Sequence, residues 1–310
     1  MRRCTVRLGI TPWQLGERRA TALAAQARYA EAVGYDSLWV PESHFGADAL
    51  PEPLLLLAAM AAVTERIRLG TTSYLLTLRN AVQAAEQVAV LDQLCGGRLI
   101  LGVGRGFSAP VLRAFAVDPR DKRALFETRL ADMRKHWAGQ PLDAGDPTSV
   151  RLEPLPLQRP HPPVWVAAFG PKALAQAGRL GLPYLASPVE TLAELEANYA
   201  LHRSALVEAG HTRALEVPVM RTLFVTRDRA ETARLRADVA AAAARSGRLA
   251  SDPDVESWTV IGEASYVRER VAEYRERLGV TEFIVTRLRI EGMAAERLEQ
   301  SAAAARAILS

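Results

Sequence analysis

Short apolar segments recur along the chain at a nearly constant interval, and they predict β-strands separated by helices. The first four segments start about 31 residues apart and cover residues 5–10, 37–40, 68–72 and 99–103. The intervals between them carry apolar positions at the helical period, as in residues 18–33, which end before the helix-stopping Gly34. The pattern therefore predicts a repeated βα unit.

The same alternation continues in the second half of the chain. Strands are predicted at residues 164–168, 184–186, 217–226 and 282–286, and helices at 172–179, 191–209, 228–245 and 265–278. Eight strands that are apolar on both faces and separated by helices favour a parallel sheet. In 310 residues they predict an α/β protein built as a single (β/α)8 TIM barrel, one domain over residues 1–310, with a doubly wound sheet as the alternative.

A proline-rich segment interrupts the alternation after the fourth βα unit. Residues 140–163 contain seven prolines, and they follow a helix predicted over residues 123–138. Because proline lacks a backbone N–H and clashes inside a helix, this segment is predicted to be an extended surface insertion.

Composition excludes several classes of protein. The chain is 49% hydrophobic and 24% charged, which is typical of a globular protein in water. Its longest apolar run, residues 54–63, is about half of the roughly 20 residues that a membrane-spanning helix needs. The first residues leave no room for the apolar stretch of a secretory signal, so we expect a cytoplasmic protein with no membrane partner.

The charge pattern does not indicate a nucleic-acid partner. The net charge is +4 and the isoelectric point is about 9.3, but basic residues alternate with acidic ones in helical stretches such as residues 268–277. The two cysteines, Cys4 and Cys95, form no close pair, and the five histidines lack the spacing of a ligand set. We therefore expect no nucleic acid, no disulfide framework and no metal.

Catalytic groups of a parallel barrel lie in the loops after the strands, so we expect the reactive side chains of this chain in those loops. His44, flanked by Glu42 and Ser43, could exchange a proton near neutral pH. Arg105, in a glycine-rich turn, is either a fixed guanidinium for a phosphate or carboxylate, or a surface arginine on a tight turn. Trp13 and Phe45 could wall a pocket for a planar ligand, although Trp13 could equally fill the barrel.

Five segments in this order resemble the luciferase-like flavin-dependent monooxygenase family, the family of bacterial luciferase. They read LGITPWQ, GYDSLWVPESHF, LDQLCGGRLILGVGRGF, PPVWVAAFGPKALAQAGRLGLP and TVIGEASYVRERVAEYRERLGV, and together they span nearly the whole chain. The barrel fold that the resemblance implies agrees with the strand count made above.

The resemblance implies a site for FMN. It places Arg105 and Arg123 on the FMN phosphate, with the backbone of Phe169 and Gly170 nearby. It also implies a non-prolyl cis peptide under the flavin ring, for which Thr71–Thr72 occupies the matching place. The positions that match others lining the flavin are Phe107 and Ser187.

One motif departs from the family. The family has Glu-His-His-Phe, whose first histidine is catalytic, whereas this chain has Ser43 at that position, between Glu42 and His44. Serine cannot replace an imidazole, which argues against light emission from an aldehyde. Ser43 could still hydrogen-bond a substrate or the flavin, and His44 could take over part of the acid–base task.

The resemblance implies a two-component monooxygenase, in which reduced FMN from a separate reductase and molecular oxygen oxidise a small organic substrate. The substrate pocket is assigned to Trp13, Phe45 and Tyr74. A deazaflavin coenzyme-dependent hydride-transfer enzyme and a non-catalytic flavin-binding protein remain as alternatives. The sequence does not identify the substrate.

A homodimer is expected from two apolar segments. Residues 54–63 and a helix carrying Val82, Ala85, Val88 and Ala89 have more apolar positions than one barrel face needs. They also match the place where the family pairs its barrels.

Overall fold

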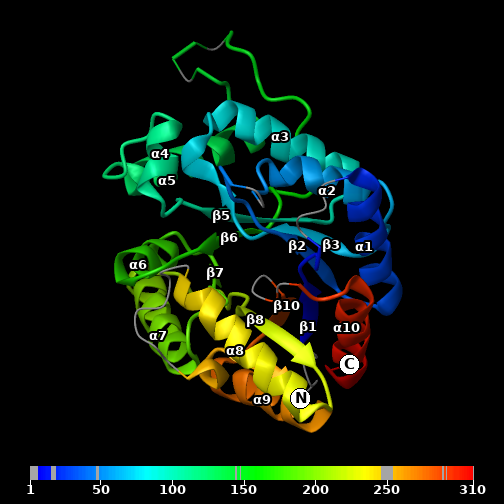
Figure 1. The fold of residues 1–310 in the computed structure, drawn as a ribbon. Helices are drawn as coiled ribbons and strands as arrows, with labels where there is room; N and C mark the ends of the chain where they lie inside the picture. The colour runs from blue at the N-terminus through cyan, green and yellow to red at the C-terminus, as the bar shows by residue number, and fades with distance from the viewer. Residues whose placement is uncertain are drawn as a thin grey trace. The chain divides into compact units, whose positions relative to one another are not determined.

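Parallel β-strands alternate with α-helices in the computed structural model (Figure 1), so the predicted α/β barrel class is confirmed. The residues described are 6–14, 19–46, 49–143, 145–146, 148–245, 254–287, 290 and 292–309. Residue contacts divide the chain into two compact units. Unit 1 comprises Met1–Gln14, Tyr29–Leu38 and Ala168–Ser310, and unit 2 comprises Leu15–Arg28 and Trp39–Ala167. That residues 1–310 form a single domain stays a prediction.

Unit 2 contains three neighbouring parallel strands. They are β3 (Arg68–Thr71), β5 (Leu99–Gly104) and β6 (Val164–Ala167), in the order β6-β5-β3. A two-residue strand that the sequence did not reveal, β4 (Tyr74–Leu75), also pairs with β5. All six residues of β5 are buried, as expected for a central parallel strand.

Four helices accompany these strands: α2 (Pro53–Ala61), α3 (Ala81–Leu94), α4 (Ala109–Ala114) and α5 (Lys122–Trp137). The Asn80 side chain caps α3 by accepting hydrogen bonds from two backbone N–H groups. Beyond α3, Gly96 and Gly97 have φ angles of 62° and 74°, which glycine adopts at little cost. The indole of Trp137 donates a 3.1 Å hydrogen bond to Ala85 O and thereby ties α5 to α3.

The proline-rich insertion is confirmed. Within residues 140–163, the described residues form no helix, and their only β pairing is an isolated bridge between Pro141 and Arg151. The end of the segment is anchored on α3, because the buried Asp92 carboxylate accepts two hydrogen bonds from Gln158, at 2.8 and 2.7 Å.

The core of unit 2 includes a pair of stacked indoles. Trp39, in β2 (Ser37–Val40), and Trp165, in β6, have ring centroids 5.0 Å apart and an interplanar angle of 24°. A Cβ on Gly70 would lie 2.3 Å from the Trp39 ring. Only glycine therefore allows β3 to approach this ring so closely.

Unit 1 contains a second set of parallel strands. In order they are the start of β2, β1 (Arg7–Ile10), β10 (Glu282–Thr286), β8 (Pro218–Val225) and β9 (Thr259–Gly262). A short strand, β7 (Tyr184–Leu185), also belongs to this unit. The sequence did not predict β9, so the count of eight strands was too low.

The helices of unit 1 follow the predicted alternation. They are α6 (Pro171–Arg179), α7 (Leu192–Glu208), α8 (Arg229–Arg245), α9 (Ala264–Leu278) and the unpredicted α10 (Ala295–Leu309). Thr191 and Glu194 form a capping box at the start of α7. Helix α1 (Ala20–Val33) contributes residues to both units and ends at Gly34, whose φ is 96°. Among the described residues, no helix is long and apolar enough to cross a membrane.

Candidate functional site

A buried carboxylate, Glu42, lies in the loop after β2 in unit 2. Its side chain is 0% exposed, and its Oε1 lies 2.8 Å from Arg79 Nη1. Its Oε2 accepts a 2.8 Å hydrogen bond from the backbone N–H of Leu75. The Arg79 guanidinium also lies 3.4 Å from Glu52 and over the ring of Tyr74. Glu42 is therefore held by groups that come from a later part of the chain.

The same carboxylate orients the imidazole of His44. The distance from Glu42 Oε1 to His44 Nε2 is 2.6 Å. Because an ionised carboxylate only accepts hydrogen bonds, Nε2 donates, and Nδ1 is the nitrogen left to interact with a ligand. In the described part of the chain, no hydrogen bond engages Nδ1. A carboxylate that fixes an imidazole in this way is a usual arrangement for general acid–base chemistry.

Ser43, the other predicted catalytic residue, closes the loop on itself. Its backbone N–H donates to Leu50 O at 3.1 Å, and its Oγ accepts from Leu50 N at 3.0 Å. The residue is exposed, so its hydroxyl can still donate a hydrogen bond to a ligand. The structure thus shows a loop-closing contact for this serine that the sequence did not suggest.

Two aromatic rings lie against the imidazole. The centroid of Phe115, which follows α4, is 4.9 Å from that of His44 in an edge-on geometry. The centroid of Phe45 is 5.9 Å from each of those two rings. Phe45 is 68% exposed and Phe115 37%. Phe45, predicted as a pocket residue, therefore lies beside the predicted catalytic His44.

The end of β3 carries the two predicted flavin-supporting threonines. Thr71 is fully buried, and its hydroxyl donates to Gly102 O at 2.7 Å. Thr72 N donates to Val40 O at 2.8 Å. The non-prolyl cis peptide joins Thr72 to Ser73, so its expected position between Thr71 and Thr72 was wrong by one residue. The strand conformation continues through Thr71, which explains why the cis bond comes later.

Tyr74, assigned to the substrate pocket, is completely buried. Its hydroxyl lies 3.1 Å from Gln87 Oε1, and the Arg79 guanidinium stacks 3.9 Å from its ring centroid. Burial raises the pKa of the Tyr74 phenol. Its contacts support Arg79 and, through Arg79, the position of Glu42.

Two cations of unit 2, Arg105 and Lys122, are influenced by the charge of Arg123. Burial and the nearby charge of Arg123 lower the pKa of Arg105 to about 10. Burial, together with the charges of Arg105 and Arg123, lowers the pKa of Lys122. The structure therefore brings together both predicted phosphate arginines and a lysine that the sequence did not single out. Like charges that raise one another's energy favour an anion between them.

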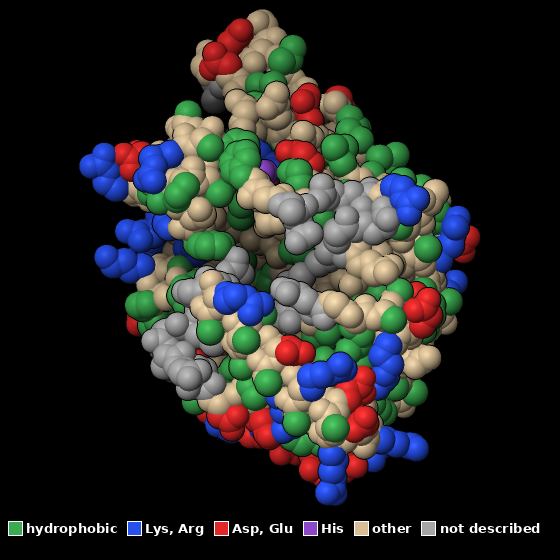
Figure 2. Space-filling view, in the orientation of Figure 1, with side chains coloured by type: hydrophobic (Ala, Val, Ile, Leu, Met, Phe, Trp, Pro, Cys, Tyr) green, Lys and Arg blue, Asp and Glu red, His purple; other side chains and the backbone are tan. Residues whose placement is uncertain are grey.

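The surface around these cations is also basic. Figure 2 shows Lys and Arg side chains gathered over α4 and α5. Phe107, predicted to line the flavin, is 71% exposed just after β5. The Arg105 guanidinium donates to Ala167 O at 3.2 Å, which fixes its direction.

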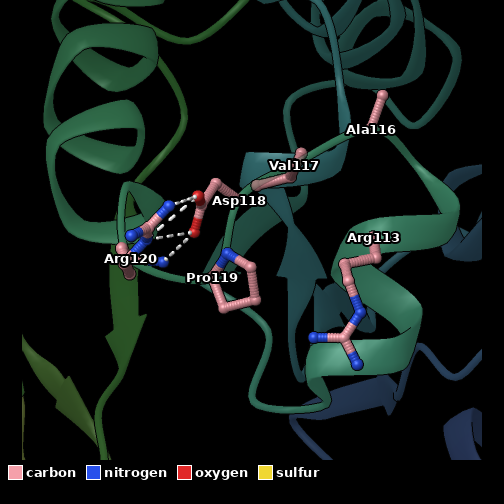
Figure 3. A pocket seen from close by; sticks show the side chains of 6 residues that line it. All are labelled: Arg113, Ala116, Val117, Asp118, Pro119 and Arg120. Carbon is pink, nitrogen blue, oxygen red and sulfur yellow. Dashed lines mark hydrogen bonds and ion pairs between the residues drawn. The ribbon is translucent and has the colours of Figure 1, made fainter.

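A hollow of about 340 Å³ lies at the connection between α4 and α5 (Figure 3). It is lined by Arg113, Ala116, Val117, Asp118, Pro119 and Arg120. Arg120 already donates hydrogen bonds to both carboxylate oxygens of Asp118, and these hydrogen bonds lower the pKa of Asp118 to about 2. No residue predicted from the sequence lines this hollow, and its own carboxylate disfavours a phosphate there.

Three of the remaining predicted residues lie in unit 1 with distinct environments. Trp13 is buried and packs edge-on against Tyr29, with centroids 5.5 Å apart. Phe169 is 66% exposed. Gly170 caps the N-terminus of α6 with a φ of 81°, a conformation that suits glycine and exposes helix N–H groups.

Ser187 is held through its backbone by two buried charged residues. Its N–H donates to Glu190 Oε2 at 2.6 Å, and its carbonyl accepts from Arg221 Nη1 at 3.1 Å. Glu190 Oε1 also accepts from Tyr184 and Asn198. Burial raises the pKa of Glu190 although these hydrogen bonds oppose the shift. Glu190 and Arg221 thus fix the loop after β7, and only the fold reveals this.

Within unit 2 the structure groups Ser43, His44, Phe45 and Tyr74 around Glu42 and Arg79, and Arg105 with Arg123. Among the described residues, no group of three or more His, Cys, Asp or Glu side chains could hold a metal ion. The candidate site therefore consists of a carboxylate–imidazole pair, a set of cations and exposed aromatic rings.

Comparison with known proteins assigns the family. The family model described as luciferase-like monooxygenase matches residues 7–282. The chain belongs to the luciferase-like monooxygenase family. Relatives of the chain include enzymes named as monooxygenases and as F420-dependent oxidoreductases.

One relative of this luciferase-like chain is the alkanal monooxygenase alpha chain of Photorhabdus luminescens, which is 27% identical over 61% of this chain and 54% of its own length. Another is an F420-dependent glucose-6-phosphate dehydrogenase of Beutenbergia cavernae, which is 36% identical over 51% of this chain and 50% of its own. The luciferase-like chain therefore spans about half the length of these curated relatives.

Solved structures show the same fold. Monooxygenase RslO1 from Streptomyces bottropensis superimposes with a TM-score of 0.80 at 22% identity, covering 98% of each chain. The oxygenating constituent of 3,6-diketocamphane monooxygenase from Pseudomonas putida, in complex with FMN, gives 0.76 at 19% identity, covering 97% of this chain and 96% of its own. These likenesses establish the luciferase-like fold of this chain.

Proposed function

We propose that this protein is the oxygenase of a two-component, FMN-dependent monooxygenase that oxidises a small organic substrate. Reduced FMN would come from a separate reductase, and molecular oxygen would be the co-substrate. The proposal rests on the cations Arg105, Lys122 and Arg123, which lie near enough for the charge of Arg123 to lower the pKa of the other two, and which fit the phosphate that FMN carries. A similar structure in complex with FMN supports this choice.

The residues of unit 2 fit the cofactor chemically. Arg105 and Arg123 would bind the phosphate, because guanidinium groups form charge-assisted pairs with phosphate oxygens. The exposed Phe107 offers an apolar surface to the flavin ring. Bound FMN would supply the reaction with oxygen, while the protein supplies binding, orientation and exclusion of water.

His44 is assigned the proton-transfer role. Its Nε2 is committed to Glu42, so Nδ1 would accept a proton from the substrate or return one to the product. Glu42 would stabilise the imidazolium that forms. Ser43 would donate a hydrogen bond through its hydroxyl, since its oxygen already accepts one from Leu50.

A specific observation favours a second candidate, hydride transfer with the deazaflavin coenzyme F420. The relative with 36% identity is named as an F420-dependent dehydrogenase. Anaerobic titration with reduced FMN and, separately, with reduced F420, followed by admission of oxygen, distinguishes the two. We expect FMN binding and oxygen consumption, whereas F420 binding without oxygen consumption would replace the first proposal by the second.

The phosphate assignment is tested in the same titration with Arg123→Ala. We expect reduced FMN to bind about 1.5–3 kcal/mol more weakly, the range for a charged hydrogen bond. Riboflavin, which lacks the phosphate, should bind wild type and variant equally. Arg113→Ala is the matched control, because Arg113 lies on the neighbouring helix and is not assigned to the phosphate. An equal loss for FMN and riboflavin would contradict the assignment.

A homodimer is proposed with a corrected surface. Ala85, Val88 and Ala89 are fully buried within the protein, so they are not available for a partner as the sequence suggested. The exposed apolar side chains on these helices are Leu55 on α2 and Val90 and Leu94 on α3, which are 70%, 43% and 64% exposed. Light scattering at micromolar concentration should give twice the chain mass of 33.8 kDa, and Leu94→Glu should lower it. A monomeric wild type would refute the proposal.

A further inference from the structure

We infer that the substrate is a planar aromatic compound with a hydroxyl group on the ring, bound against Phe45 and Phe115 with its hydroxyl on His44 Nδ1. The inference rests on the proposed function, because it names the substrate class of the same site. Its starting point is the juxtaposition of exposed aromatic rings with a carboxylate-backed imidazole.

The exposure of the rings is the first argument. Phe45 is 68% exposed and Phe115 37%, and both lie within 5.9 Å, centroid to centroid, of the His44 imidazole. Large apolar side chains that gather at the surface usually mark a binding site. Aromatic rings attract another ring in offset or edge-on geometry, at centroid distances of about 4.5–7 Å.

The geometry also fixes where a ligand ring could lie. The Phe45 and Phe115 centroids are only 5.9 Å apart, at an angle of 34°. A third ring between them would need roughly 4.5 Å on each side, so the ligand must lie against their outer faces. His44, whose side chain is 6% exposed, would then meet the edge of the ligand where a hydroxyl projects.

Backbone strain is an independent argument. The non-glycine residues with positive φ among those described are Phe45, Glu52 and Ala116, at 57°, 55° and 56°. Phe45 is one of the two aromatic residues beside His44, and Ala116 directly follows the other, Phe115. Glu52 contacts Arg79. Such conformations are costly for side chains larger than glycine, and they concentrate at functional sites. Here Phe45 and Ala116 lie in or beside the segments that carry the rings, and Glu52 lies against Arg79, which holds the buried carboxylate.

A ligand hydroxyl group could donate a hydrogen bond to the acceptor nitrogen Nδ1 of His44. Nδ1 has no hydrogen-bond partner among the described residues, so it calls for a donor. In the proposed step the ring hydroxyl O–H bond breaks and the proton passes to Nδ1. The electron pair remains on oxygen as a phenolate, and Glu42 stabilises the resulting imidazolium. The phenolate ring is richer in electrons and hence more readily oxidised.

The test is equilibrium binding of three probes to the whole protein without flavin. They are 2-naphthol, its methyl ether 2-methoxynaphthalene, which has no proton to donate, and decahydro-2-naphthol, which has no aromatic ring. We expect 2-naphthol to bind about 10-fold more tightly than the saturated alcohol, and at least about 3-fold more tightly than the methyl ether. The absorption of bound 2-naphthol should shift to longer wavelength as its hydroxyl gives its proton to His44 Nδ1 and the naphtholate forms.

Variants assign these effects to residues. Phe45→Ala and Phe115→Ala should each weaken 2-naphthol binding by about 3- to 10-fold, while Val150→Ala, an equally exposed apolar control in the proline-rich segment, should not. His44→Phe keeps a ring but removes the acceptor, so it should abolish the spectral shift and the preference over the ether. If that variant fails to fold, the comparison of the two probes on wild type still decides.

Three results would overturn the inference. The first is equal binding of 2-naphthol and the saturated alcohol. The second is a loss of FMN affinity in Phe115→Ala as large as its loss of 2-naphthol affinity, which would assign the rings to the cofactor. The third is FMN binding without 2-naphthol binding, which would reject the substrate class and leave the proposed function standing. Binding of 2-naphthol without binding of FMN would reject the proposed function alone.

Discussion

Replacing Glu42 by alanine is expected to lower the free energy of unfolding by about 3–5 kcal/mol, the range for breaking a buried ion pair. The carboxylate is 0% exposed and Arg79 only 10%. Without Glu42, the Arg79 guanidinium retains two partners: the Leu75 carbonyl, which accepts a 2.9 Å hydrogen bond, and the carboxylate of Glu52 at 3.4 Å. The backbone N–H of Leu75 and the imidazole of His44 lose their acceptor as well. Unfolding in guanidinium chloride, followed by tryptophan fluorescence, measures the change in the free energy of unfolding.

Two matched variants separate the causes of this loss. Glu42→Gln retains a carbonyl oxygen of the same size, so its cost should be intermediate. Glu52→Gln removes the other carboxylate beside Arg79, which is 47% exposed, and should cost less than about 1 kcal/mol. If Glu42→Ala were no more destabilising than Glu52→Gln, the buried pair would not stabilise the fold.

The second large effect is expected for Trp39→Ala, which should lower the free energy of unfolding by about 3–5 kcal/mol relative to wild type. The indole is fully buried and stacks on Trp165, so its removal leaves a cavity and eliminates the stacking contact. The same unfolding measurement applies, with Trp39→Phe as the control that keeps an aromatic ring and should lose less.

A double-mutant cycle with Gly70 identifies the contact. Gly70→Ala alone forces a methyl group to 2.3 Å from the buried Trp39 ring and should cost about 1–3 kcal/mol. In the Trp39→Ala background the same methyl group enters the cavity. The double variant should therefore lose less free energy of unfolding than the two single variants lose together. Strict additivity would show that the two residues do not compete for this space.

The sequence predicted the repeating elements well because their signals are local. The helices α1 and α3 are followed by glycines with positive φ, Gly34 and Gly96, and the bounds of β2 and β10 match the predicted ones. The strand β9 follows the short 3-10 turn Val255–Ser257 rather than an α-helix, so the alternation of strands and helices did not mark it, although the predicted β1 and β2 are equally short. Strand β4 has two residues, too few for any periodicity.

The candidate site was predicted in part, for the same physical reason. His44 and Glu42 are neighbours in sequence, so their pairing could be suspected. Arg79 lies 37 residues from Glu42, and nothing in its local sequence marks it as the cation that holds a buried carboxylate. The buried links from Glu190 and Arg221 to Ser187 depend likewise on tertiary packing.

The contacts of Ser43 bear on what the family's histidine would do at this position. The Ser43 hydroxyl oxygen accepts the Leu50 N–H at 3.0 Å, and a histidine at this position would present a larger ring with a different reach. Ser43→His would therefore remove the side-chain hydrogen bond that joins residue 43 to Leu50. The position is thus coupled to the conformation of its own loop, and a change made there for catalysis also changes what holds the loop closed.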